Sequence, residues 1–109
     1  MEKSQKEQMI EKIKEEGKKI LDKYFGNRNY DKDKVELWKD YTIEDVTNFL
    51  EKKYQDFGFV ISIIVINGYM WEDSNQICRN TDGTLNISES FNTMYCLMRI
   101  YFIKFQIHK

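Results

Sequence analysis

The run FGFVISIIVI at residues 57–66 constrains the fold of this chain more than any other segment. It is dense in β-branched residues and too short for a typical helix. It is also well below the roughly 20 residues that span a bilayer, so the sequence predicts no transmembrane helix and no membrane partner. The run therefore predicts a buried β-strand.

Asn67-Gly68 follows this run directly and is among the strongest short signals for a β-hairpin, because a type I′ turn needs positive φ at both positions. A second strand is therefore expected over residues 69–79. Its sequence, YMWEDSNQICR, is largely polar after Trp71, so burial fixes its register only weakly. The expected place of such a strand is an edge of the sheet, where it can accept another chain.

Two more strands are expected after the turn residues at 80–83. In TLNISESF, residues 84–91, apolar and polar residues alternate, which predicts a strand with one wet face. The last run, residues 93–106, is apolar on both parities apart from Arg99 and Lys104, which is typical of a long central strand.

The first half of the chain has helical spacing instead. Over residues 4–25, apolar side chains recur every three or four positions, and Gly17 takes the one inward position without a side chain. Gly26-Asn27 then offers the left-handed residue that ends many helices.

A second amphipathic helix is expected over residues 34–54, with Asp31 and Asp33 as suitable N-caps. Short loops between the strands imply antiparallel pairing. The prediction for residues 1–109 is one α+β domain, in which two N-terminal helices pack on one face of a four-stranded antiparallel sheet.

Composition and motifs exclude several functions. Seventeen basic and eighteen acidic side chains leave a formal charge of −1, which predicts no nucleic-acid partner. The one histidine, His108, stands next to the end, and Cys78, Cys96 and His108 fall short of a four-ligand zinc site. We expect no enzyme and no cofactor. The charged start, MEKSQKEQMIEK, lacks the apolar core of a secretory signal, which favours a reducing, cytosolic location.

One alternative concerns residues 78–89, CRNTDGTLNISE, which fit much of a twelve-residue calcium loop. Asn80, Asp82, Gly83 and Glu89 stand at the positions that the loop requires. Cys78 stands where a hard cation prefers a carboxylate oxygen. A β-turn at Asp82-Gly83 is the other interpretation, and the calcium-responsive EF-hand-like protein stays as the alternative hypothesis.

Three short motifs resemble the Tctex-type dynein light chains. KVELW begins the second helix, TDGT forms the turn, and TMYC follows that turn after eight residues. The resemblance covers residues 8–105, and TMYC is its most specific part. The motif residues are Lys34, Val35, Trp38, Asp82, Gly83, Thr93, Met94, Tyr95 and Cys96.

The resemblance implies a non-catalytic homodimer of two helices and four antiparallel strands per chain. It implies that the chain joins the microtubule-associated dynein complex in the cytoplasm, where it binds the dynein intermediate chain and cargo adaptors. In this family the second strand receives an extended, often basic, segment by strand addition. Carried over, the binding edge is Met70, Trp71, Glu72, Asp73, Ser74, Asn75, Gln76, Ile77, Cys78 and Arg79.

The chain departs from the family pattern at three places, one of which is a C-terminal strand that runs a few residues longer. The connection after residue 66 is shorter than in the family, so exchange of the second strand between subunits stays open. Ile77 and Cys78 replace a tryptophan-aspartate pair before the turn. Among single residues, we interpret Trp38 as a core or interface aromatic and Cys96 as a small buried hydrophobe. Trp71 fits either an interface aromatic or a ligand platform.

Overall fold

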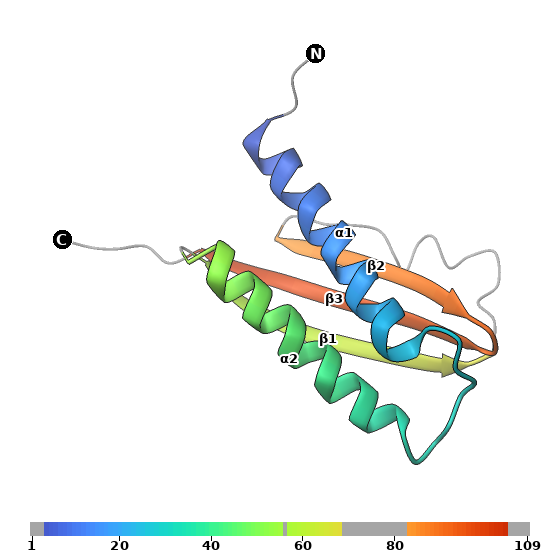
Figure 1. Cartoon of the computed structure of the whole chain (residues 1–109). Coiled ribbons are helices and arrows are strands. Elements are labelled where there is room, and N and C mark those ends of the chain that lie inside the picture. Colours follow the sequence, from blue (N-terminus) through green and yellow to red (C-terminus); the bar gives the residue numbers. More distant parts are fainter. Residues whose placement is uncertain (1–3, 56, 69–82, 105–109) are drawn as a thin grey trace.

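Two helices pack against one face of a three-stranded antiparallel sheet (Figure 1). This computed structural model describes residues 4–55, 57–68 and 83–104. The predicted α+β class, with two helices followed by an antiparallel sheet, is confirmed. The predicted strand at 69–79 lies outside the described residues, so a fourth strand and the homodimer stay predictions. The elements are α1 (Gln5–Phe25), α2 (Val35–Lys53), β1 (Phe57–Asn67), β2 (Thr84–Phe91) and β3 (Met94–Lys104).

Helix α1 is capped at both ends by short-range hydrogen bonds. The Ser4 hydroxyl accepts a hydrogen bond from the backbone N–H of Glu7 at 3.1 Å, which satisfies one of the free amides of the first turn. At the other end Gly26 has φ −62°, and Asn27 is the left-handed residue, with φ 57°. Asparagine tolerates this conformation better than most residues, so the helix ends here without a left-handed glycine.

Helix α2 begins differently from the sequence prediction. Lys34 is the N-cap and makes no side-chain capping bond. Asp31 acts one turn earlier: its side chain accepts from the N–H of Asp33 at 3.0 Å, and its carbonyl accepts from the N–H of Val35 at 2.9 Å. The assignment of Asp31 and Asp33 as N-caps is therefore wrong, because Asp31 closes a turn that leads into the helix.

The strand order is β1-β3-β2, and both neighbours of β3 run antiparallel to it. The prediction that the last apolar run is the central strand is confirmed. The predicted type I′ turn at Asn67-Gly68 is wrong: Asn67 continues β1 opposite Met94, and only Gly68 has positive φ, at 131°. Thr93 lies in the turn before β3 and not in the strand.

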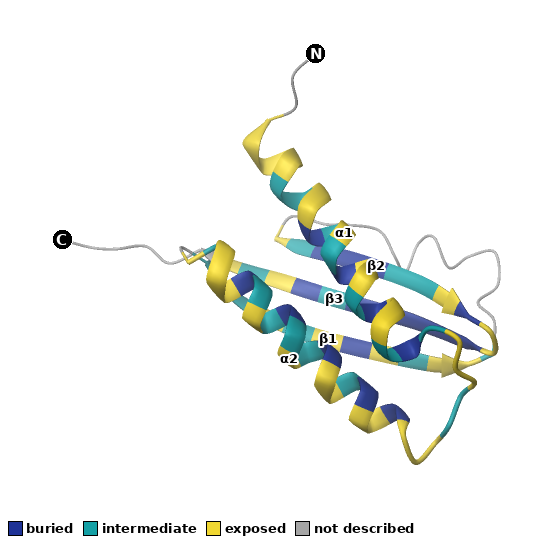
Figure 2. Ribbon diagram, viewed as in Figure 1, coloured by how far each residue is buried: buried dark blue, intermediate teal, exposed yellow. Residues whose placement is uncertain are grey.

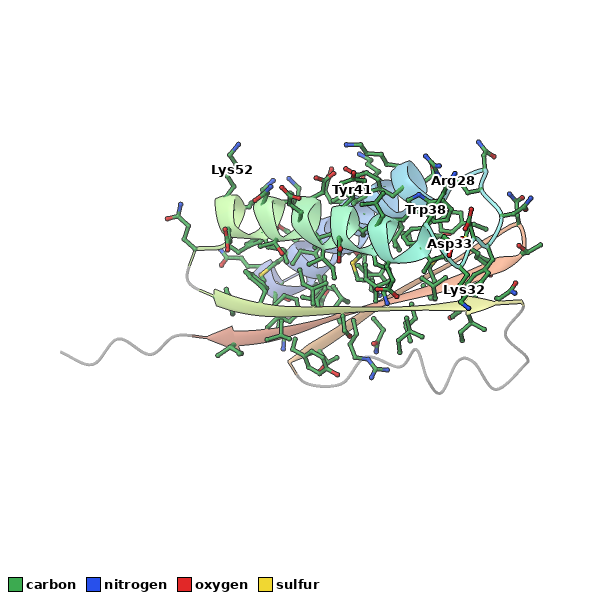
Figure 3. All side chains as sticks on the ribbon, turned by 90° about the horizontal axis from the view of Figure 1, so that it is seen from below. Arg28, Lys32, Asp33, Trp38, Tyr41 and Lys52 are labelled. Atoms are coloured by element: carbon green, nitrogen blue, oxygen red, sulfur yellow. The ribbon has the colours of Figure 1, made fainter. Side chains whose placement is uncertain are left out.

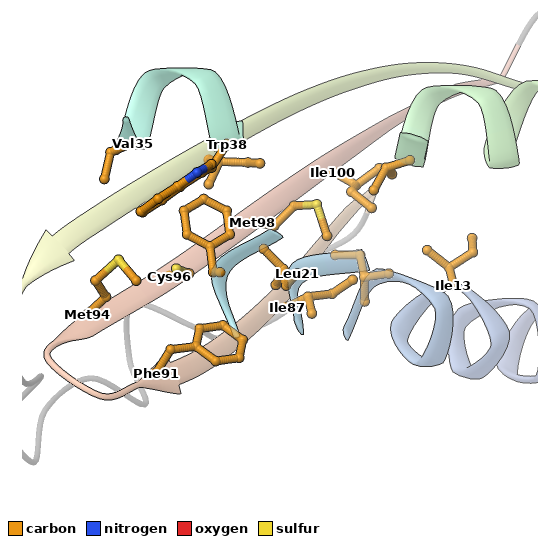
Figure 4. Close-up of a cluster of buried hydrophobic side chains, with 14 of the residues drawn as sticks. Ile13, Leu21, Val35, Trp38, Ile87, Phe91, Met94, Cys96, Met98 and Ile100 are labelled. Atoms are coloured by element: carbon orange, nitrogen blue, oxygen red, sulfur yellow. The ribbon is translucent and has the colours of Figure 1, made fainter. Parts of the chain in front are cut away.

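The core lies between the helices and the sheet (Figures 2 and 4). Helix α1 lies close to the sheet at Gly17, where an added Cβ atom would lie 2.6 Å from Ile87 Cδ1 and 3.0 Å from Met98 Cε. A side chain at this position would require the ends of Ile87 and Met98 to shift. The buried apolar cluster consists of Ile13, Leu21, Phe25, Val35, Trp38, Val46, Leu50, Ile63, Leu85, Ile87, Phe91, Met94, Cys96, Met98 and Ile100.

Candidate interaction surfaces

The motif residues that the structure describes belong mainly to the core and to one end of the molecule. Val35, Trp38, Met94, Tyr95 and Cys96 are all buried, each with less than a tenth of its surface exposed. Lys34 and Gly83 are exposed, at the start of α2 and before β2. Asp82 lies outside the described residues. Most of these residues therefore maintain the fold.

Thr93 links three segments at one end of the sheet. Its hydroxyl accepts a hydrogen bond from the N–H of Tyr30 at 3.2 Å, and its carbonyl accepts from the N–H of Gly68 at 2.6 Å. Beside it, the Asn92 side chain donates to the carbonyl of Arg28 at 3.1 Å. These bonds hold the α1–α2 connection against the β2–β3 turn, which gives the first residue of TMYC a structural role.

Trp38 packs under the same connection. Its ring lies edge-on to Phe25, with centroids 5.8 Å apart, and the Arg28 guanidinium lies 5.0 Å from the ring centroid (Figure 3). Its backbone carbonyl accepts a hydrogen bond from the Thr42 hydroxyl at 2.8 Å. The indole is thus enclosed by its own chain, which agrees with the interpretation of Trp38 as a core aromatic.

The structure gives no support to the calcium-loop alternative. In an EF-hand the last loop residue supplies a bidentate ligand next to the exiting helix. Here Glu89 lies within strand β2, opposite Cys96, and its carboxylate lies 3.8 Å from the Lys18 ammonium. Among the residues that the structure describes, no cluster of three or more His, Cys, Asp or Glu side chains could hold a metal ion.

The predicted binding edge, Met70 to Arg79, lies outside the described residues, so its residues cannot be placed relative to the sheet. The described part of the chain offers two other surfaces, which sequence reasoning missed. One is the face of the sheet opposite the helices, and the other is the outer edge of β1.

The helix-free face is the face of the sheet opposite α1 and α2 (Figure 3). Side chains alternate between the two faces of a strand, so residues of one parity in β1 and β3 project here. Part of this face is exposed: Val60 by 52%, Ile64 by 50%, Ile66 by 37%, Tyr101 by 39% and Ile103 by 52%. Tyr95 and Leu97, which stand opposite Ile66 and Ile64 on β3, are buried. The sequence already indicated these residues, because the segments that form β1 and β3 are apolar at both odd and even positions.

A polar row crosses this apolar face. Ser62, Arg99 and Asn86 stand opposite one another on β1, β3 and β2, and Arg99 Nε donates to Asn86 Oδ1 at 2.8 Å. Arg99 is the one charged residue that the described strands direct to this side. The bond between Arg99 and Asn86 joins β3 to β2 within this largely apolar surface.

Two hydrogen bonds show which backbone N–H and C=O groups of β1 face β3 and which face outward. Gly68 N–H donates to Thr93 O, directly opposite it, and Phe102 N–H donates to Gly83 O, also opposite. Because bonded and non-bonded pairs alternate in an antiparallel ladder, the even residues of β1 bond to β3. The odd residues of β1, from Phe57 to Asn67, then direct their N–H and C=O groups outward. No strand of the described residues pairs with that edge.

The outer surface of the helices carries a polar network that joins α1 to α2. The Tyr24 hydroxyl donates to Asp45 Oδ2 at 2.7 Å, and Lys23 Nζ lies 3.3 Å from the same oxygen. The hydrogen bond to Asp45 raises the pKa of Tyr24, and contacts with Tyr24 and then Asp45 raise the pKa of Lys23. The Tyr24 ring also stacks at a tilt on Tyr41, with centroids 5.5 Å apart. These contacts hold two helices together and form no catalytic arrangement.

Cys96 is a free thiol at the centre of the core. Burial, and secondarily the negative charge of Glu89, raise its pKa to about 12. The thiolate is therefore negligible at neutral pH, and the thiol behaves as a small apolar side chain.

Comparison with known families decides the assignment. The family model described as the Tctex-1 family matches residues 7–103, which is most of the chain. The chain belongs to the Tctex-1 family. This is a family of non-catalytic dynein light chains, and the resemblance of the motifs is thereby confirmed. No curated protein matches the chain. No helix among the described residues has both the length and the apolar character needed to cross a membrane.

Proposed function

We propose that this chain acts as a non-catalytic, homodimeric adaptor in the dynein motor complex, where it binds an extended segment of the dynein intermediate chain and cargo adaptors. The observation that carries the proposal is the exposed apolar helix-free face in a member of the Tctex-1 family. Exposed apolar side chains gathered on one face of a sheet are typical of an interaction surface.

A second copy of the chain is the proposed partner there. Two sheets pack face to face about 10 Å apart, with the side chains of the two inner faces interdigitating. Val60, Ile64 and Ile103 each keep about half of their surface exposed. Complete burial of each side chain therefore contributes roughly 1 kcal/mol of further free energy. In a two-fold dimer both subunits bury the same side chains, so each contribution occurs twice. Part of that gain offsets the entropy cost of association.

The proposed site for the intermediate chain is the edge from Met70 to Arg79. An extended segment that pairs with this edge forms main-chain hydrogen bonds, which supply affinity. Side chains of one parity then select the sequence. The carboxylates of Glu72 and Asp73 suit a basic segment. The proposal places the chain on microtubules in the cytoplasm, within the dynein complex.

The test is binding of a fluorescent, basic intermediate-chain peptide, followed by anisotropy. The double variant Asp73→Pro/Asn75→Pro removes two backbone donors from the proposed edge. We expect it to lose saturable binding. The matched control, Asp73→Ala/Asn75→Ala, keeps both N–H groups and loses only side chains, so its affinity should fall by no more than about tenfold.

Equal affinity of wild type and a folded proline variant would contradict the assignment of the edge. A large loss in the alanine control would show that the side chains, and not the main chain, supply the affinity. Circular dichroism of each variant checks that the fold is intact.

A further inference from the structure

The outer side of α2 carries a continuous stripe of exposed residues. The buried residues of this helix, from Val35 to Leu50, recur at steps of three or four and face the sheet. The residues on the opposite side of the helix are all exposed. We call them the α2 stripe, which consists of Leu37, Asp40, Tyr41, Glu44, Asn48 and Glu51.

Two large apolar side chains lie in the α2 stripe. Leu37 is exposed by 48% and Tyr41 by 43%, and no other large apolar side chain of the described helices is exposed to this degree. They are four residues apart, so they are neighbours on the helix surface. Figure 3 shows Tyr41 on the side of α2 that points away from the sheet. Its ring packs against Tyr24 of α1, which restricts its orientation. The stripe thus presents a small, ordered apolar contact area to solvent.

The charge of the α2 stripe is negative. Elsewhere on the outer surface of the helices, carboxylates lie 3.3 to 3.7 Å from lysine ammonium groups, namely those of Glu15, Glu16, Glu36 and Asp45. Asp40, Glu44 and Glu51 form no ion pair with any residue that the structure describes. Lys52 borders the stripe only at its C-terminal end. The stripe itself contains three carboxylates and no basic side chain, so it attracts positive charge.

This chemistry decides among the possible occupants of the stripe. A second copy would place one acidic stripe against another, and nucleic acids and anionic membranes carry negative phosphate groups, so repulsion disfavours all three. An extended peptide gains no main-chain hydrogen bonds here, because the N–H and C=O groups within a helix are paired internally. An amphipathic helix with apolar and basic side chains satisfies both conditions.

The spacing of the stripe also suits a helix as the partner. The steps between Leu37, Tyr41, Glu44, Asn48 and Glu51 are three or four residues, as in a contact between two helices. From its first to its last residue the stripe rises about 21 Å, because each residue of an α-helix adds about 1.5 Å. A partner helix of about 15 residues therefore covers it. Leucines of that helix would contact Leu37 and Tyr41, and lysines or arginines would face the carboxylates.

We propose that the α2 stripe is a docking site for a basic amphipathic helix of a partner protein. The stripe lies on the outer side of the helix layer, whereas the proposed dimer uses the opposite face of the sheet (Figure 3). Dimerisation through the helix-free face therefore leaves the stripe exposed on both subunits. A dimer with both stripes occupied carries two partner helices at once.

The first test is binding of a synthetic helical peptide to the wild-type chain, followed by fluorescence anisotropy at about 0.15 M salt. The probe has about 18 residues, with leucine at steps of three and four and lysine or alanine elsewhere. A scrambled peptide of the same composition has no apolar stripe. We expect saturable binding of the probe and at least about tenfold weaker binding of the scrambled peptide. Equal affinities would overturn the proposal, because net charge alone would explain the binding.

The position of the bound probe is measured by NMR of the isotope-labelled chain. Titration with the probe should shift the amide signals of residues 37–51 in α2. The signals of Val60 and Ile64, on the helix-free face, should stay unchanged. Shifts in the strands without shifts in α2 would overturn the assignment of the site.

A matched pair of double variants tests the carboxylates. Asp40→Asn/Glu44→Gln removes two charges from the stripe and keeps the side-chain shapes, so the affinity for the probe should fall at least about fivefold. Glu7→Gln/Glu15→Gln removes two charges from exposed positions of α1 and should change the affinity by less than about twofold. Circular dichroism checks that both variants are folded. Equal losses in the two variants would contradict a site on α2.

A second matched pair tests the apolar contact. Leu37→Ser should weaken binding of the probe at least about fivefold, whereas Ile64→Ser should leave it within about twofold of wild type. Leu37 is exposed by 48% and Ile64 by 50%, so the two changes differ mainly in the surface that they alter. Equal effects of the two variants would overturn the proposal.

These measurements separate the inference from the proposed function. If the wild-type chain is a monomer that binds the probe at α2, the proposed dimer fails while the α2 site stands. If the wild-type chain is a dimer that does not bind the probe, the α2 site is refuted while the dimer stands.

Discussion

The two faces of the sheet are built from similar residues but differ in how completely these residues are buried. On the helix-covered face, Ile87, Met98 and Ile100 have at most 1% of their surface exposed. On the helix-free face, Ile64 and Val60 keep half of theirs exposed, although Leu97 and Tyr95 of β3 are buried. The difference arises from the layers and not from the strands. Two helices can cover only one face of a sheet, so an apolar second face indicates a partner outside the described fold.

The largest effect that this comparison predicts concerns one isoleucine on each face. Ile87→Ala creates a cavity under α1 and should lower the free energy of unfolding by about 2–5 kcal/mol. Ile64→Ala removes a half-exposed side chain and should cost at most about 1 kcal/mol per chain, measured under conditions where the chain is monomeric. Urea denaturation of both variants measures the difference. Equal losses would mean that the helix-free face is already buried within the chain.

The second prediction concerns association. Val60→Lys/Ile64→Lys places four like charges in the proposed dimer and should weaken its dissociation constant at least about a hundredfold, with little effect on the monomer. Leu37→Lys is the matched control, because Leu37 is exposed by 48% but lies on α2. Sedimentation equilibrium measures both variants. If Leu37→Lys dissociated the dimer instead, the interface would lie on the helices.

The smallest effect is expected at Gly17, where α1 lies close to the covered face. At Gly17 alanine improves helix propensity by about 1 kcal/mol, but its Cβ meets the ends of Ile87 and Met98, both buried. Overpacking costs about 1–3 kcal/mol, so a net loss near 1 kcal/mol is expected from thermal or urea unfolding. A stabilised Gly17→Ala variant would mean that the two layers separate more easily than the contacts indicate.

The sequence predicted the elements better than their ends. Apolar spacing identified both helices, and apolar residues on both parities identified β3 as the central strand. Local hydrogen bonds decided the ends: Asp31 closes a turn before α2, and pairing with Met94 keeps Asn67 in β1. Where a helix begins or a strand ends depends here on contacts with residues far away in the sequence, which a local sequence pattern does not contain.

The candidate surfaces were harder to predict than the fold. The motif residues were found by resemblance, and Val35, Trp38 and Cys96 are core residues, as the sequence had indicated for Trp38 and Cys96. The exposed residues Val60, Ile64 and Tyr101 carried a signal that was interpreted only as burial. The sequence indicates that both faces are apolar, and only the arrangement of layers reveals which face the helices leave open.

The most direct test of the central claim, that a second copy covers the helix-free face, is the solution mass of the wild-type chain by light scattering at about ten micromolar. Repeating the measurement in EDTA and in calcium checks the alternative hypothesis at the same time. We expect a dimer of about twice 13.3 kDa, unchanged by calcium. A monomer at this concentration would contradict it, because the exposed apolar face would then need no second copy.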